Sequence, residues 1–258
     1  MSVISRQYSS VKPDIHKNNW KPDVVYLYQF PRLRVIPQLS PYCLKLETWL
    51  RVSDIEYENC FTWIKRSSEG LLPFIELNGE HIADSQLIIS RLQRHFMIHE
   101  GLSGEEKAVG RAIDRMIEGN TFYALLYFKS VENWRNLANR EILGVPLPSF
   151  VLQSLFLKIS RKIEKMIWKQ GIGRHCREDI VNILRKDVEA ISTILGDKKF
   201  LFGIRPTVAD CTVFGHFAST YYLPFRQPIV DLLDEEFPRV KAHLQRMRSH
   251  YFPEWKLD

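Results

Sequence analysis

The chain has 258 residues, 45% of them hydrophobic and 12% aromatic, which is enough apolar material for one large domain or two small ones with a buried core. Its 36 lysines and arginines against 30 aspartates and glutamates give a formal net charge of +6, and this weak, scattered excess does not indicate a nucleic-acid-binding protein. The four cysteines lie far apart, with no CxxC pair and no histidine cluster at zinc spacing, so we expect no metal site and a reducing compartment, the cytoplasm.

The chain begins with a polar segment, residues 1–22, which lacks the apolar run of a secretory signal. A first strand is predicted at residues 24–30, VVYLYQF, because β-branched and aromatic residues are concentrated there and Pro31 ends the run. A first helix is predicted to begin at Ser40, since serine is a favoured N-cap and Pro41 suits the first helical position.

Cys43 lies in the first turn of this predicted helix. It shares an apolar face with Leu46 and Leu50, at spacings i, i+3 and i+7. We therefore expect a buried cysteine that packs as a small hydrophobic residue. The alternative is a reactive single thiol, which would need exposure and a lowered pKa. Dithiol exchange within this motif is excluded, because the other position of a CxxC pair is Ser40.

Two more strand regions and a second helix follow. Strands are predicted within residues 55–61 and 72–77, and the Asn-Gly pair that comes next is a strong hairpin signal leading to a return strand through Ile82. Another helix is predicted to begin at Asp84 and Ser85. Strand, helix, strand, hairpin and helix in this order indicate a right-handed βαβ unit followed by an antiparallel hairpin, which is a thioredoxin-like arrangement.

Helical patterns replace strand patterns from about residue 104 onward. Helical segments are predicted at residues 103–128, 148–170, 177–195 and 207–219. The predicted organisation is a polar tail (1–22), a thioredoxin-like domain (23–98), a linker (99–104), an all-helical domain (105–251) and a C-terminal tail (252–258).

Two features of the helical half are predicted to be structural. The sequence TVAD forms a capping box, in which Thr207 caps the helix start and Asp210 reaches back to the backbone of Thr207. A basic stripe at helical spacing is predicted to be a solvated face, with a membrane or partner surface as the alternative. Its members are Lys158, Arg161, Lys162, Lys165 and Lys169.

Short motifs in this order resemble a known superfamily. SPYC at the first helix, LP before the third strand, ADS at the second helix and the late TVAD box resemble the glutathione transferase superfamily. Over residues 24–250, the stretches YLYQFPR, LSPYCLKLETWLR, LLPFIELNGEHIADSQLII and FLFGIRPTVADCTVFGH are similar to the failed axon connections family, which is related to the metaxins. The resemblance implies an α/β thioredoxin-like N-terminal domain followed by an all-α glutathione-transferase-type C-terminal domain.

The resemblance also implies a catalytic role for Ser40. In that superfamily the bound glutathione is the nucleophile, and a residue near this helix start interacts with its sulfur. A hydroxyl donor and the positive end of a helix both favour the thiolate form. The alternative, from the residues themselves, is that Ser40 is only an N-cap.

Four more positions match glutathione-binding residues of the superfamily. Leu72 would present its backbone to the cysteinyl unit, with Pro73 in the cis form. The helix start at Asp84 and Ser85 would hold the γ-glutamyl end. The alternatives are a strand start that maintains the fold and a plain helix cap.

The first functional hypothesis is a glutathione-transferase-like protein that binds glutathione or a related small thiol, with weak or no alkyl or aryl transfer to the thiolate. Two departures count against catalysis. The loop of residues 31–39 is long enough to fill the pocket, and Leu71 stands where many relatives carry a polar residue. The sequence does not fix the oligomeric state; a homodimer is one option that the resemblance offers, because dimers are common among transferases.

The second hypothesis is a non-catalytic protein-interaction module of metaxin-like type, acting at a membrane or in neuronal development. Its candidate surfaces are the loop that carries Arg32 and Arg34 and the basic stripe. Peripheral membrane association is part of this alternative. An open cleft beside Ser40 would favour the first hypothesis, and a filled cleft the second.

Overall fold

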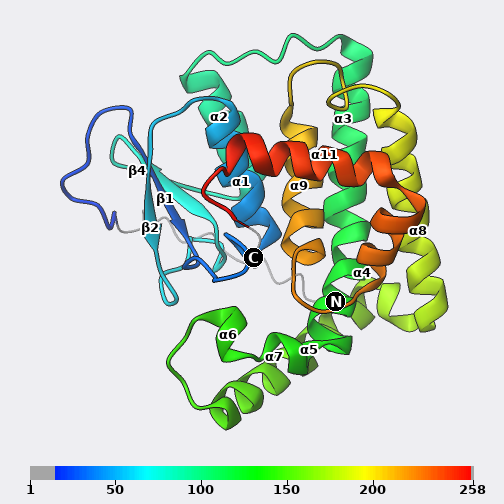
Figure 1. The fold of residues 1–258 in the computed structure, drawn as a ribbon. Coiled ribbons are helices and arrows are strands. Elements are labelled where there is room, and N and C mark those ends of the chain that lie inside the picture. The colour runs from blue at the N-terminus through cyan, green and yellow to red at the C-terminus, as the bar shows by residue number, and fades with distance from the viewer. Residues whose placement is uncertain (1–14, 257–258) are drawn as a thin grey trace, which may run out of the picture.

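The computed structural model describes residues 15–256, which form a small α/β domain beside a larger helical domain (Figure 1). The first domain contains β1 (Val25–Gln29), α1 (Pro41–Val52), β2 (Tyr57–Phe61), β3 (Phe74–Leu77), β4 (Glu80–Ala83) and α2 (Ser85–His95). The second contains α3 (Gly104–Met116), α4 (Phe122–Tyr127), α5 (Trp134–Leu137), α6 (Arg140–Leu143), α7 (Ser149–Gln170), α8 (Arg177–Leu195), α9 (Val208–Tyr221), α10 (Pro228–Asp231) and α11 (Pro238–Tyr251). Short π turns η1 (Ile117–Thr121), η2 (Phe128–Glu132) and η4 (Leu232–Glu236) and a 3-10 turn η3 (Ile172–Arg174) connect them.

The sheet has the strand order β2-β1-β3-β4. β1 and β2 are parallel and are joined by α1, whereas β3 is antiparallel to both β1 and β4. The turn between β3 and β4 has positive φ at Asn78 (51°) and Gly79 (76°), as a tight two-residue hairpin requires. The predicted thioredoxin-like unit, a βαβ followed by a hairpin, is thereby confirmed.

One face of this sheet is covered by the beginning of the described chain. The connection between β2 and β3 contains no helix in the structure. The segment before β1 packs on the sheet instead. The backbone N–H groups of His16 and Lys17 donate to the carboxylate of Glu76 on β3, at 2.7 and 2.9 Å. The His16 ring also packs against Tyr28 of β1, with ring centroids 5.6 Å apart. The described part of the predicted polar tail is therefore packed on the domain, while residues 1–14 lie outside the described residues.

The helical domain is built around α9, most of whose side chains are buried. This helix packs against α1 of the first domain, and the two backbones approach closely because residue 215 is glycine. A β-carbon on Gly215 would lie 2.7 Å from both the Pro41 carbonyl oxygen and the Lys45 backbone nitrogen. The close contact fixes the second domain beside the start of α1, where Ser40 lies.

A buried ion pair crosses the same junction between the domains. Lys45 of α1 donates to Glu118 of η1 at 2.6 Å, and neither side chain is more than 8% exposed. Arg115 of α3 also pairs with Glu118. Removing one partner of a buried pair leaves an uncompensated charge. The ion pair therefore ties the domains together in one arrangement.

The predicted capping box at the start of α9 is present. Asp210 Oδ2 accepts hydrogen bonds from the N–H and the hydroxyl of Thr207, at 2.8 and 2.9 Å. Asp210 Oδ1 accepts from the Leu201 N–H and lies 2.9 Å from Nε2 of His243 on α11. This fully buried carboxylate thus joins the start of α9 to two other segments.

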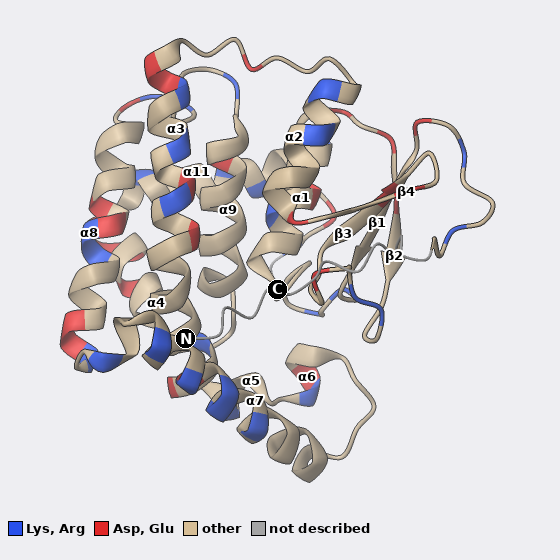
Figure 2. Ribbon diagram, turned by 180° about the vertical axis from the view of Figure 1, so that it is seen from behind, with Lys and Arg blue, Asp and Glu red and all other residues tan. Residues whose placement is uncertain are grey.

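Helices α5 to α7 form a lobe below the sheet in the view of Figure 1. The basic residues of the stripe lie on α7 and are exposed, and they appear as a row of blue segments in Figure 2. No helix within residues 15–256 is long and apolar enough to cross a membrane. The predicted helical segments correspond to α3 with α4, α7, α8 and α9, whereas α11 is not among them.

Candidate functional site

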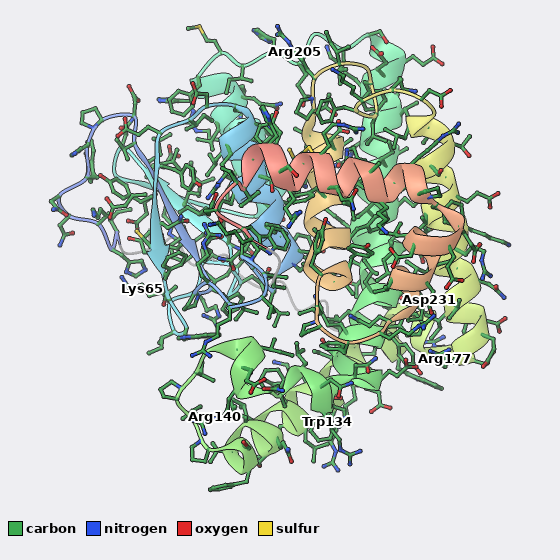
Figure 3. The ribbon with its side chains drawn as sticks, viewed as in Figure 1. Lys65, Trp134, Arg140, Arg177, Arg205 and Asp231 are labelled. Atoms are coloured by element: carbon green, nitrogen blue, oxygen red, sulfur yellow. The ribbon has the colours of Figure 1, made fainter. Side chains whose placement is uncertain are left out.

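A cleft of about 1920 Å³ opens between the two domains. Its wall includes all the residues that the resemblance assigns to the glutathione site, namely Ser40, Leu72, Pro73, Asp84 and Ser85. Ligand pockets in proteins usually measure about 300–1,000 Å³. The cleft therefore has room for more than one small ligand. In Figure 3, the label of Lys65 lies on the sheet domain, and the labels of Arg140 and Trp134 lie on the lobe formed by α5 to α7.

The loop of residues 31–39 forms part of the wall and does not fill the cleft. Its apolar side chains Leu33 and Ile36 are buried in the core. The indole N–H of Trp255, beyond the end of α11, donates to the Val35 carbonyl at 3.0 Å. These contacts hold the loop against the body of the protein, and the cleft beside the start of α1 stays open.

Ser40 is the N-cap of α1, with φ −79° and ψ 119°. Its Oγ accepts a hydrogen bond from the Cys43 N–H, and the bond is long at 3.4 Å. Capping uses the hydroxyl oxygen as an acceptor, whereas contact with a thiolate would use the O–H as a donor. The two roles predicted for Ser40 are therefore compatible in one geometry. The helix start also adds positive potential at this point.

Cys43 is fully buried beneath Ser40. Burial raises the pKa of its thiol to about 12, although hydrogen bonds from Ser40 and the Phe30 backbone act in the opposite direction. A buried thiol with a raised pKa is unreactive, so the geometry favours the packing role for Cys43. Within residues 15–256 no three His, Cys, Asp or Glu side chains are grouped to hold a metal ion.

Leu72 lies at the edge of the cleft just before β3, and its bond to Pro73 is cis. Among residues 15–256, no backbone hydrogen bond uses the N–H or carbonyl of Leu72. Both groups are therefore available to an extended peptide ligand, which could pair with them as a neighbouring strand does.

Asp84 and Ser85 have different local roles at the start of α2. Asp84 Oδ1 accepts from the backbone N–H groups of Gln86 and Leu87, at 2.9 and 3.1 Å, and so caps the helix. Asp84 adopts a positive φ of 67°, which is uncommon for a residue other than glycine. The cap does not use the Ser85 hydroxyl, and Ser85 lies on the cleft wall. The geometry assigns capping to Asp84 and leaves Ser85 free for a ligand.

The cleft wall also carries charged groups that the sequence interpretation missed, two from the helical domain and one from the sheet domain. Glu118 lies on the cleft wall, where it pairs with Arg115 and lies 3.4 Å from the Gln86 amide nitrogen. Arg66, in the connection between β2 and β3, is an exposed cation on the same wall. Lys129 of η2 is a third such group and is almost completely buried. No local motif marks these residues, since their place in the cleft depends on how the domains pack.

The other part of the cleft is apolar and belongs to the helical domain. Its side chains come from α4, α6 and α7, and they include Leu126, Leu143, Leu152, Phe156, Ile159 and Ile163. The cleft thus has a polar side, made mainly by the sheet domain, and an apolar side. Such a division suits a polar ligand and an apolar ligand held next to one another.

Known families match both domains. Residues 41–134 match a glutathione S-transferase N-terminal domain, and residues 184–247 match a glutathione S-transferase C-terminal domain. The chain is 36% identical to failed axon connections of Drosophila melanogaster, over 95% of its own length and 62% of the length of that protein. The chain belongs to the failed axon connections family, within the glutathione transferase superfamily. It spans somewhat less than two thirds of its Drosophila relative.

This member of the failed axon connections family is also similar to glutathione transferases and to a metaxin. It is 26% identical to isoprene-epoxide glutathione S-transferase of a Rhodococcus species, over 84% of this chain and 94% of the relative. It is 24% identical to mouse metaxin-2, over 73% of each chain. The solved structure of glutathione transferase GSTFuA3 from Phanerochaete chrysosporium matches with a TM-score of 0.63 at 17% identity, covering 90% of this chain and 99% of that one. The predicted fold class and family are confirmed.

Proposed function

We propose that this protein binds glutathione in the cleft between its domains, with the thiol beside the start of α1. One observation carries the proposal: Ser40, Leu72 and Ser85 line a single open cleft. Within residues 15–256 the backbone of Leu72 makes no backbone hydrogen bond, the Ser85 hydroxyl takes no part in the helix cap, and the Ser40 hydroxyl accepts only one long bond. A site kept only for folding would satisfy these groups internally.

The groups on the wall match the parts of the tripeptide. The backbone of Leu72 suits the cysteinyl backbone, and the hydroxyl of Ser85 at the start of α2 suits the γ-glutamyl carboxylate. Glu118 suits the ammonium group, and Arg66 suits the glycyl carboxylate in place of the polar contact that Leu71 lacks. Ser40 and the start of α1 then stabilise the thiolate.

The apolar side of the cleft supports transfer to a second ligand. Bound beside the sulfur, an apolar electrophile would be buried against α4 and α7, with its reacting carbon held near the nucleophile. The name of the Rhodococcus relative, an isoprene-epoxide glutathione S-transferase, supports the same chemistry. The proposed activity is addition of the glutathione thiolate to an apolar electrophile.

Retention on immobilised glutathione, followed by elution with free glutathione, tests the binding. Ser85→Ala should weaken binding by about tenfold or more, because it removes a hydrogen bond to a charged group. Ser154→Ala, an exposed serine on α7 away from the cleft, is the matched control and should bind as the wild type does. Failure of the wild-type protein to bind glutathione at millimolar concentration would contradict the proposal.

A second candidate function, a protein-interaction module, is favoured by the basic face of α7. Its lysines and arginine are exposed, and within residues 15–256 none of them pairs with a carboxylate (Figure 2). Arg32 is a weaker candidate surface, because it pairs with the buried Glu47. Reversing the charges of Lys158, Lys162 and Lys165 should release any partner that co-purifies with the protein. Glutathione binding should not change, and partners that stay bound would contradict this candidate.

A further inference from the structure

Lys129 is a buried cation on the cleft wall that the proposed glutathione site does not use. It lies in η2, and only 3% of its surface is exposed. Its ammonium group donates a hydrogen bond to the backbone carbonyl of Leu39 at 3.1 Å. Leu39 immediately precedes Ser40, so the cation is held close to the start of α1, where the proposed thiolate lies.

The side of the helix that carries Lys129 faces the cleft. Residues at helical spacing along η1, α4 and η2 line it, namely Gly119, Phe122, Tyr123, Leu126, Lys129 and Ser130. Lys129 is the one cation in this row. Its ammonium group reaches the carbonyl of Leu39, next to Ser40, whereas Leu126, about one helical turn earlier in the same row, belongs to the apolar side.

Lys129 has no carboxylate partner within residues 15–256, whereas Arg91 pairs with Glu80 and Arg115 pairs with Glu118. Arg66 and Arg94 on the same wall also lack a carboxylate partner among these residues, but both are exposed, so Lys129 is the buried member of this group. An ammonium group has three donors, and the Leu39 carbonyl uses one of them. Two donors remain for a ligand.

The surroundings of Lys129 keep its proton labile. Burial lowers its pKa to about 7. His216 of α9 also faces it, and burial together with the charges of Lys45 and Lys129 lowers the pKa of that imidazole to about 3. The imidazole is therefore neutral near pH 7 and does not act as a counter-ion. An amine of this kind can give up a proton at neutral pH and regain it from water.

We propose that Lys129 donates a proton to an oxygen atom of the second substrate while the thiolate attacks the neighbouring carbon, and that this substrate is an apolar epoxide. The inference rests on the proposed function and specifies its substrate class. It makes Lys129 a catalytic residue, because its ammonium group touches the reacting oxygen.

The step balances without any further reactant. The thiolate electron pair forms the sulfur–carbon bond, the carbon–oxygen bond of the ring breaks, and its electron pair goes to the oxygen. That oxygen takes a proton from the Lys129 ammonium, which gives a thioether with a hydroxyl on the adjacent carbon and leaves a neutral amine. Water returns a proton to Lys129 after the product leaves.

An epoxide is an electrophile whose reaction needs a proton donor such as the Lys129 ammonium group. Its oxygen stays attached to the product and would become a strongly basic alkoxide without a proton donor. An alkyl halide, by contrast, releases a halide ion that needs no proton. A positioned general acid with a pKa near the working pH contributes about 10²–10⁴-fold to the rate.

Two electrophiles of similar size test the inference, styrene oxide and benzyl chloride. Lys129→Met should lower the rate with styrene oxide by about 100-fold or more and leave the rate with benzyl chloride nearly unchanged. Lys158→Met, an exposed lysine on α7, is the matched control and should change neither rate. If Lys129→Met does not fold, Lys129→Gln is compared in the same way.

An equal loss with both electrophiles would overturn the inference, because it would mean that Lys129 only holds Leu39 in place. No loss with styrene oxide would overturn it as well. Calorimetric titration with glutathione measures binding independently of the reaction. It therefore distinguishes a failure of the inference about Lys129 from a failure of the proposed glutathione binding. Wild-type protein that binds glutathione but does not open styrene oxide contradicts the inference alone, whereas protein that binds no glutathione contradicts both.

Discussion

Arg32, in the loop before α1, donates hydrogen bonds to both carboxylate oxygens of Glu47, a fully buried residue on α1. Arg51, Gln29 and Tyr57 donate to the same carboxylate. The network attaches the loop to α1 on the side away from the cleft. It therefore helps to keep open the space that a ligand needs beside Ser40.

Glu47→Gln should destabilise the protein. The substitution keeps the shape of the side chain but leaves Arg32 and Arg51 without their shared carboxylate. Loss of one partner of a buried ion pair costs about 3 kcal/mol or more, measurable as a lower free energy of unfolding in urea. The control is Glu58→Gln, which breaks the exposed pair of Glu58 with Lys17 and should cost less than about 1 kcal/mol. Equal effects would contradict the importance of the network.

The same carboxylate predicts how stability depends on pH. Burial by itself would raise the pKa of Glu47, but hydrogen bonds and the positive charges of Arg32 and Arg51 outweigh it and hold the pKa below its ordinary value of 4.5. A lowered folded-state pKa stabilises the protein above the unfolded value, and this stabilisation is lost as the pH falls through the folded value. Between pH 6 and pH 3, wild-type protein should therefore lose more stability than Glu47→Gln. Parallel curves would contradict this assignment.

Gly215→Ala should disturb the contact between α9 and α1. The added methyl group would clash with the backbone at Pro41 and Lys45, which cannot move without shifting a helix. Overpacking of this kind costs about 1–3 kcal/mol. Thermal unfolding measures the loss, and Gly104→Ala, where a β-carbon meets nothing within 4 Å, is the control. Two variants of equal stability would contradict the close approach of the helices.

Asp210→Ala should lower stability and leave glutathione binding unchanged. The variant removes a buried carboxylate that holds Thr207, Leu201 and His243, so a loss of about 3 kcal/mol or more is expected in thermal or urea unfolding. Glu106→Ala breaks the capping box of Ser103, which is exposed, and should cost only about 1 kcal/mol. Unchanged thermal stability of Asp210→Ala would contradict the structural role of Asp210.

Ser40→Ala should raise the pKa of bound glutathione. Loss of one hydrogen bond to the thiolate corresponds to about one pKa unit or more. The ultraviolet absorption of the thiolate, followed as a function of pH in the complex, measures this change. Stability should fall by less than about 1 kcal/mol, since the capping bond of Ser40 is long. A bound thiol with an unchanged pKa would mean that Ser40 serves only as a helix cap.

Local signals in the sequence were sufficient for much of the fold. The N-cap at Ser40, the Asn-Gly hairpin and the capping box at Thr207 depend on neighbours within a few residues, and each lies where its motif predicts. The resemblance to known transferases then grouped Ser40, Leu72 and Ser85, which the structure brings to one cleft.

The remaining features depend on contacts between distant residues. His16 reaches Glu76 across 60 positions, and Trp255 reaches Val35 across 220, so no local pattern reveals either contact. Lys129 looks like any helical lysine in the sequence, and its burial follows from the packing of the domains. The state of the cleft could not be predicted for the same reason, because the long loop before α1 can fill it or line it.

A crystal structure of the protein with glutathione shows whether the cleft between the domains is a glutathione site. We expect one glutathione molecule in the cleft, with its sulfur within hydrogen-bonding distance of Ser40 Oγ. Its cysteinyl backbone should pair with Leu72, and its γ-glutamyl carboxylate should contact Ser85. A cleft that stays empty at saturating glutathione, or a ligand bound elsewhere, would mean that the cleft beside Ser40 is not a glutathione site.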